Sequence, residues 1–504
     1  MMRWMTALAL LAAVGPAVVG REAQEAAVPA DKKLYVVAVS KATYADPAWR
    51  AVVEALVAKH QGRVVPYAGG VESARAQLAA WMPDYICFVA RPEEAGRNFV
   101  VAVSRMTRQL DDDWSDAVWG ILTGYDAADA LRIAQRAEPL LVRRGASGLG
   151  PGYVSGLESW FAAEETGFWV KPAGQKEAAV PVQPDAAEAL ANGFNTMKPQ
   201  VFYTSGHASE HNWNIGYKGP AGQFRHTGGD LCSVDTKGKT FPINSPEPKV
   251  YLPMGNCLIG HVDRRDCMAT AWMHSGGVYQ MYGYTAVTWV GRMGWGTQAA
   301  FNGGATLSEA FYFTSQGLLR ELNESYPQYA GINFETYDQD KIDWLAGHHG
   351  LVKRNEKTGQ MEMLETPMGL LWDRDCVGFY GDPAWEARMP VEHPWTQAWS
   401  RVGAGEWTLT ITPLKDEGGP AGLTTLLPER LTGAKVFASQ PGGGPDGKPV
   451  VTDNFLIVSP RPKEGYKKAV SVTIRVTGSP MVRPNRQKLA QALAEAAESK
   501  PAGK

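Results

Sequence analysis

Two short segments constrain the fold most, because each is an apolar run that reaches a glycine and is then followed by a reactive side chain. The first is Val201-Phe-Tyr-Thr-Ser-Gly-His207, and the second is Val250-Tyr-Leu-Pro-Met-Gly-Asn-Cys257. In an open α/β sheet the strands are buried, and functional groups lie just beyond their carboxyl ends. The two segments therefore predict parallel neighbouring strands that place His207 and Cys257 side by side above the sheet.

This pair of side chains is suited to nucleophilic catalysis. A free thiol has a pKa near ~8.5 and is mostly protonated at neutral pH. A neighbouring imidazole can accept the thiol proton and later protonate a leaving amine. Cys257 is accordingly the candidate nucleophile, and His207 is the candidate base.

Strand-like and helix-like segments alternate in the N-terminal part of the chain, which predicts βαβ units and a parallel sheet flanked by helices. No glycine-rich phosphate fingerprint follows the first strand, so nucleotide binding is not indicated. Further alternation follows Cys257. The expected strands are 34–40, 63–67, 85–90, 117–122 and 278–284, and the expected helices are 47–60, 71–81, 126–136, 268–274 and 307–322.

The residue pattern changes at about Gly405, where helix-like segments give way to short strand-like runs. Short runs of alternating or β-branched residues follow, separated by turns rich in Gly, Pro and Asp. This pattern predicts an all-β sandwich over residues 403–480. An Ala-rich segment over residues 485–504 predicts a tail helix.

The two motifs resemble those of the gingipain-type cysteine peptidases, which are caspase-like enzymes. The resemblance covers Thr204–Trp213 and Leu252–Cys257 and extends to Trp272–Thr285 and Tyr380–Pro390. It implies a caspase-like, mostly parallel sheet in two subdomains, 31–190 and 195–395, and an immunoglobulin-like C-terminal domain. It also implies that Trp289 forms an aromatic wall of the substrate pocket. The family has Gly where this chain has Ala208, and its acidic arginine-pocket residue has no match here.

These observations predict a cysteine endopeptidase that forms an acyl-enzyme. Backbone N–H groups of Cys257 and of Ala208, or alternatively Gly206, would form the oxyanion hole. Glu210 or Asp230 could orient His207. No cofactor is expected, and structural calcium remains an option, for instance at Asp111-Asp-Asp113, although that run lacks the spacing of a known calcium loop.

Two other functions compete with this one. A catalytically inactive relative could bind peptides or a cell surface. His207-Ala-Ser-Glu210-His211 also fits the HxxEH zinc motif, which needs both histidines on one helix face. The preceding β-rich run and Gly206 favour a strand and a loop instead. His348-His349 is flanked by glycines and is expected to be a plain loop rather than a metal site.

The N-terminus predicts export. Arg3 precedes the apolar run Ala7–Val19, which has small residues at its end, and residues 1–20 therefore read as a signal peptide. No later run is long enough to span a membrane.

A net charge of −2 argues against nucleic-acid partners, so peptides or proteins are the expected substrates in a secreted, periplasmic or cell-surface setting. The odd count of five cysteines requires a free thiol, while Cys232 and Cys267 could pair.

Overall fold

The computed structural model describes residues 33–164, 167–216, 221–416, 418–420, 422–439, 449–458 and 471–481. The predicted signal peptide at 1–20 and the predicted tail helix at 485–504 lie outside these residues. Within the described ranges, no helix combines the length and apolar character needed to cross a membrane.

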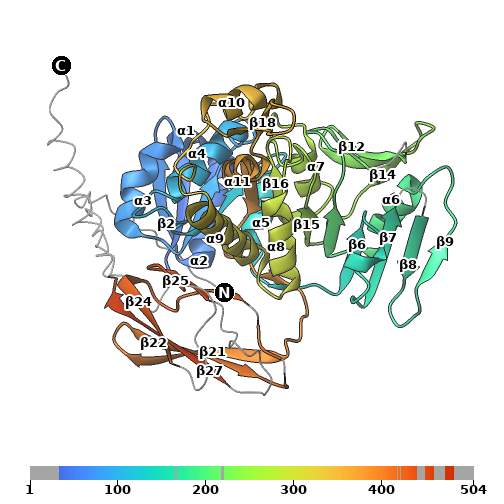
Figure 1. Ribbon diagram of the computed structural model, residues 1–504. Helices are drawn as coiled ribbons and strands as arrows, with labels where there is room; N and C mark the ends of the chain where they lie inside the picture. Colours follow the sequence, from blue (N-terminus) through green and yellow to red (C-terminus); the bar gives the residue numbers. More distant parts are fainter. Residues whose placement is uncertain are drawn as a thin grey trace, which may run out of the picture.

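A twelve-stranded, mostly parallel sheet forms the centre of the molecule (Figure 1). Its strands are largely buried, in keeping with their continuous apolar runs. In spatial order, the strands are β2 (Arg63–Tyr67), β1 (Tyr35–Ser40), β3 (Tyr85–Val89), β4 (Val118–Leu122), β19 (Val377–Gly381), β16 (Val278–Tyr284), β15 (Lys249–Pro253), β10 (Val201–Thr204), β6 (Arg144–Ser147), β7 (Ser159–Glu164), β8 (Gly167–Lys171) and β9 (Ala178–Val180).

Apart from β8 and β9, each antiparallel to its neighbour, the sheet consists of two parallel halves that run in opposite directions. Strands β2, β1, β3, β4 and β19 are parallel to one another, as are β16, β15, β10, β6 and β7. The halves meet at the antiparallel pair β16–β19. Strand β6 pairs with β10, and β7, β8 and β9 continue the sheet beyond β6, so the change of direction does not coincide with the subdomain boundary expected near residue 190.

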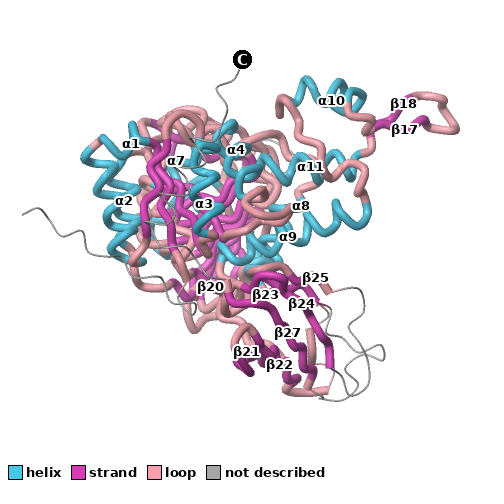
Figure 2. Tube along the Cα trace, turned by 90° about the vertical axis from the view of Figure 1, so that its left-hand side faces the viewer, coloured by secondary structure: helices cyan, strands magenta, loops and turns pink. Residues whose placement is uncertain are grey.

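Helices cover both sides of the sheet (Figures 1 and 2). Helix α2 (Pro47–His60) shows why the sequence folds this way. The Asp46 side chain caps it by accepting from Ala48 N, proline occupies its first turn, and Trp49, Val52, Val53 and Leu56 form its buried face. The other α-helices are α1 (Lys41–Ala45), α3 (Arg75–Trp81), α4 (Arg97–Thr107), α5 (Ala127–Gln135), α6 (Ala187–Met197), α7 (Met268–Met273), α8 (Arg292–Asn302), α9 (Leu307–Ser325), α10 (Ile342–His348) and α11 (Glu365–Cys376).

A small antiparallel sheet lies between the two candidate catalytic residues in sequence. Its order is β11 (Asn212–Asn214), β12 (Gln223–Thr227), β13 (Asp230–Val234) and β14 (Thr240–Ile243). Two short pairs complete the α/β part, and they are β5 (Leu140–Leu141) with β20 (Ala387–Arg388) and β17 (Val352–Arg354) with β18 (Met361–Met363).

The C-terminal module is all-β, as predicted, and it begins earlier than residue 403. One antiparallel sheet contains β21 (Trp395–Gly403), β22 (Glu406–Pro413), β27 (Val472–Pro480) and β24 (Leu431–Ser439). The other contains β23 (Leu423–Leu426), β26 (Phe455–Val458) and β25 (Val450–Val451). Side chains from both sheets, including Leu409, Leu456 and Ile474, share one core. Phe455 and Ile457 also pack against Val118 and Tyr312 of the α/β part.

Candidate active site

His207 and Cys257 follow neighbouring parallel strands, as the sequence predicts. Strand β10 pairs with β15 in a register that places Tyr203 opposite Leu252 and Thr204 opposite Pro253. Every residue of both strands is buried. The two reactive residues therefore emerge from the same edge of the sheet, just beyond the ends of adjacent strands.

Hydrogen bonds tie together the two loops that carry these residues. Met254 N donates to Thr204 O (2.9 Å), and the Thr204 hydroxyl donates to Asn256 Oδ1 (2.7 Å). The fully buried Asn256 in turn donates from Nδ2 to Gly206 O (3.1 Å). Asn256, next to Cys257, is thus hydrogen-bonded to Gly206, next to His207. No pattern in the sequence indicates this interaction.

Cys257 differs from the other cysteines in its surroundings. All five thiols are free, so Cys232 and Cys267 do not pair, and Cys257 alone is not fully buried. Thr288 N donates a hydrogen bond to Cys257 Sγ (3.4 Å). The next residue, Leu258, has φ 59°, a left-handed conformation that costs a bulky side chain about 1–3 kcal/mol. Strain of this kind is common where a turn must present a reactive group.

The His207 loop makes a sharp but unstrained turn. Gly206 has φ 101°, which glycine adopts without a steric penalty. Ala208 keeps a negative φ and forms an isolated bridge with Trp213, so an alanine at this position causes no strain. Trp213 Nε1 anchors the loop by donating to Ser205 O (2.9 Å).

The candidate base His207 and the expected oxyanion donors have no hydrogen-bond partner among the described residues. The His207 side chain is exposed and makes no hydrogen bond to any described residue, Cys257 included. The backbone N–H groups of Gly206, Ala208 and Cys257 likewise donate to no acceptor in the described part of the chain. These groups are therefore available to a ligand.

The two acids named as possible partners of His207 contact other histidines in the structure. Glu210 Oε1 lies 3.0 Å from His261 Nδ1, and this interaction holds the pKa of Glu210 below its usual value. Asp230 Oδ1 lies 4.0 Å from His274 Nε2. Glu210 lies just before the small antiparallel sheet and Asp230 begins its strand β13, and in this structure each carboxylate faces another histidine.

The HxxEH segment is not helical. Residue 208 forms a bridge, and residues 212–214 are strand β11. His211 Nδ1 instead faces His226 Nε2 (3.0 Å), and its Nε2 faces Arg264 Nη2 (2.7 Å). His207 is exposed and Glu210 is bonded to His261, so the three residues of the motif do not converge on one metal ion.

Trp289 lies on the loop between β16 and α8, beside Thr288, whose N–H contacts the thiol. Its side chain is 37% exposed, which is inconsistent with a core role. Helix α11 forms hydrogen bonds with this loop and with the start of α8. Trp372 Nε1 donates to Val287 O (2.9 Å), and Asp373 Oδ2 accepts from Met293 N (2.9 Å). The structure thus adds Thr288 and Asp373 to the site, neither of which has a local sequence signal.

The calcium expectation is not supported by charge. Carboxylate oxygens of Asp111, Asp116 and Asp453 lie within 4.8 Å of one another. However, Arg430 forms an ion pair with Asp453, and burial, together with Asp111, raises the pKa of Asp116 to about 10. Arg430 therefore competes with any cation for Asp453, and the oxygen-rich site that calcium prefers would need both Asp116 and Asp453 ionised.

Comparisons with protein-family models, with curated proteins and with solved structures found no match to this chain.

Proposed function

We propose that this protein is a cysteine endopeptidase that hydrolyses peptide bonds through Cys257 and His207. The main observation behind the proposal is the register of β10 and β15, which brings both residues to one edge of the sheet on loops tied by Asn256 and Gly206. The mostly parallel sheet flanked by helices supports the proposal of a caspase-like fold, and the two antiparallel sheets of the C-terminal module support the proposal of an immunoglobulin-like domain.

The proposed reaction uses the Cys257 thiol, the His207 imidazole and backbone N–H groups that have no partner among the described residues. His207 accepts the thiol proton as Cys257 Sγ attacks the scissile carbonyl, and the N–H groups of Cys257 and Ala208 stabilise the oxyanion. Imidazolium then protonates the leaving amine, and water activated by the neutral imidazole hydrolyses the thioester. Hydrolysis expels Cys257 Sγ as a thiolate, which the N–H of Thr288, already directed at Sγ, stabilises until the imidazolium of His207 returns the proton.

The decisive experiment is labelling with a thiol-reactive peptide probe. Wild-type protein and Cys232→Ala, which removes a buried thiol, should both be labelled and should both cleave a mixed peptide library. Cys257→Ala should lose labelling and activity while keeping its circular dichroism spectrum. Residual activity of Cys257→Ala within about tenfold of wild type would exclude the thiol mechanism, since loss of a nucleophile normally removes far more.

A second candidate function is peptide binding without catalysis. The exposed His207 makes no hydrogen bond to Cys257 and has no orienting carboxylate among the described residues. Apo sites often have loose geometry that tightens with substrate, so this observation does not exclude catalysis. Stoichiometric peptide binding with no turnover of any library member would favour the binding function.

We further propose that the protein acts outside the cytoplasm, because Arg3 and the apolar run Ala7–Val19 match a secretory signal. Expression of the full chain in a bacterial host, followed by fractionation, tests this point. Removal of residues 1–20 should keep the protein in the cytoplasmic fraction.

A further inference from the structure

The segment between α9 and α11 projects from the body of the molecule (Figure 2). It contains α10 and the β17–β18 hairpin. Only Ile342, Leu345 and Ala346 of α10 are buried, and Trp344 is 53% exposed. Apolar burial alone therefore contributes little to holding α10 in place.

Three metal-ligating side chains meet in this segment. Donor atoms of Glu335, His348 and His349 all lie within 4.8 Å of one another. His349 Nε2 and Glu335 Oε2 are 3.1 Å apart. Two ligands bound to one zinc ion at about 2.0–2.1 Å are separated by roughly 2.9–3.4 Å, so this spacing already suits a shared ion.

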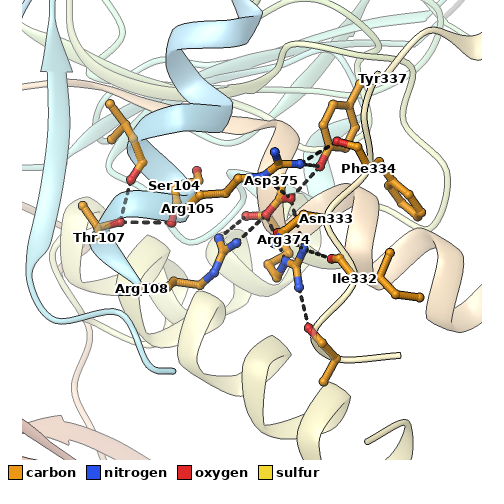
Figure 3. Close-up of polar contacts among 12 residues, drawn as sticks. Ser104, Arg105, Thr107, Arg108, Ile332, Asn333, Phe334, Tyr337, Arg374 and Asp375 are labelled. Carbon is orange, nitrogen blue, oxygen red and sulfur yellow. Dashed lines mark hydrogen bonds and ion pairs between the residues drawn. The ribbon is translucent and has the colours of Figure 1, made fainter. Parts of the chain in front are cut away.

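The Glu335 side of the cluster is held rigidly by a buried ionic network (Figure 3). Arg105 Nη2 donates to Phe334 O (2.8 Å), and Arg374 Nη1 donates to Ala330 O (2.7 Å). Both arginines also pair with Asp375. Burial alone would raise the pKa of this carboxyl, but Arg374 and Arg108 hold it well below its usual value. The backbone directly before Glu335 is thus fixed by charges that stay ionised.

Aromatic contacts orient the two histidines. The His348 ring stacks on Trp344 with centroids 4.9 Å apart and planes at 12°. The His349 ring packs against Phe334 at 5.4 Å. Both imidazoles sit at the C-terminal end of α10 and need little rearrangement to bind an ion.

We propose that Glu335, His348 and His349 bind one divalent transition metal ion of the zinc class. Two imidazoles and one carboxylate suit zinc, whereas calcium and magnesium require an oxygen-rich set. Because Glu335 and His348 are exposed, water completes the coordination. The ion links the arginine-anchored segment at Glu335 to the end of α10, and this site is independent of the proposed peptidase chemistry.

The test is zinc titration of the full chain without a histidine tag, in a Cys257→Ala background that removes the catalytic thiol as a competing ligand. Isothermal calorimetry should show one equivalent of zinc. Glu335→Gln, His348→Asn and His349→Asn should each weaken binding by about tenfold or more. His393→Asn is the matched control, because His393 also packs on a tryptophan, Trp395 at 4.3 Å, but belongs to no ligand cluster among the described residues.

Cobalt provides a second readout that does not depend on stability. Wild-type protein loaded with Co²⁺ should show visible ligand-field bands that disappear in His348→Asn and His349→Asn. An absence of stoichiometric zinc binding, or zinc affinity unchanged in both histidine variants, would overturn the proposal and leave Glu335 and His349 as an ordinary ion pair.

Discussion

His207 and His211 lie four residues apart in sequence but have different surroundings. His207 is exposed beyond the end of β10, whereas His211 is bonded to His226 and Arg264. We predict that His207→Ala lowers kcat/KM by about 100- to 10,000-fold, the usual contribution of a general acid–base. His211→Ala should keep most of the activity.

Inhibitors provide the control for this pair of variants. Iodoacetamide should inactivate the wild type, and the zinc chelator phenanthroline should not. Equal, severe losses in both histidine variants, accompanied by loss of a stoichiometric zinc ion, would favour metal chemistry with Glu210 as base.

Asp373 is a buried carboxyl beneath the candidate site. Its Oδ2 accepts from Met293 N and from the Tyr284 hydroxyl (3.1 Å), which lie at the two ends of the Trp289 loop, whereas its Oδ1 has no partner among the described residues. Burial raises the pKa of Asp373 to about 7. The folded state therefore binds this proton more tightly than the unfolded state does, whose carboxyl has a pKa near ~3.9.

The sign of the pH effect follows from this difference. The contribution of Asp373 to stability is complete below about pH 4 and is lost as the pH rises through about 7. We predict that the free energy of unfolding of the wild type falls by on the order of 4 kcal/mol between pH 4 and pH 8, as Asp373 ionises. Asp373→Asn should not show this fall. Urea unfolding at both pH values measures the difference. An unchanged slope in the variant would show that Asp373 ionises normally.

At the scale of elements, the loop between β16 and α8 sets the environment of the thiol. Thr288 contacts Sγ, and the neighbouring Trp289 is exposed. We predict that Trp289→Ala lowers kcat/KM by about tenfold for substrates with a large side chain before the cut, and less for small ones. A peptide library measures this dependence.

Phe437→Ala is a suitable control for that variant, because Phe437 is also an exposed aromatic residue but lies on β24 of the C-terminal module. It should leave specificity unchanged. A uniform loss across the library in Trp289→Ala would assign that residue a structural role.

Some elements could be predicted from sequence because their signals are local. Helix α2 and strand β2 have the expected bounds, since an Asp–Pro cap, a one-sided apolar pattern and a β-branched run define them. Helix α11 was not predicted. Every residue from Pro367 to Cys376 is buried, including Asp373, Arg374 and Asp375, so the helix has no amphipathic pattern. Its charges are tolerated because they pair with residues distant in sequence, such as Arg108.

At the scale of the whole molecule, the sequence predicted a mostly parallel sheet flanked by helices, followed by an all-β module, and the structure confirms both. It did not predict where the sheet changes direction. That point is the β16–β19 pair, whose strands lie almost a hundred residues apart, and such long-range pairing leaves no local pattern. The same limit applies to the candidate site. The strand ends before His207 and Cys257 could be predicted from the sequence, whereas the hydrogen bond from Asn256 to Gly206 could not.

A buried cation, Arg430, is one of the links between the C-terminal module and the α/β part. Arg430 donates from Nη2 to Pro83 O (2.7 Å) and to Asp116 O, and it pairs through Nη1 with Asp453. Its side chain is 2% exposed. Asn454 Nδ2 adds a second bond to Asp116 O (2.8 Å). The polar groups around Arg430 come from both parts of the chain, so removing it leaves buried acceptors and a carboxylate unpaired.

We predict that Arg430→Ala destabilises the protein by about 3–5 kcal/mol, the usual effect of removing one partner of a buried ion pair. The matched control is Arg475→Ala. Arg475 pairs with Glu406 on the surface of the same module, where its side chain is 53% exposed, and such pairs contribute about 0–1 kcal/mol. Differential scanning calorimetry measures both.

If Arg430 joins the two parts, its loss should also separate one unfolding transition into two, with the module melting first. Equal, small effects in both variants would mean that the apolar contact of Phe455 and Ile457 with Tyr312 holds the module by itself.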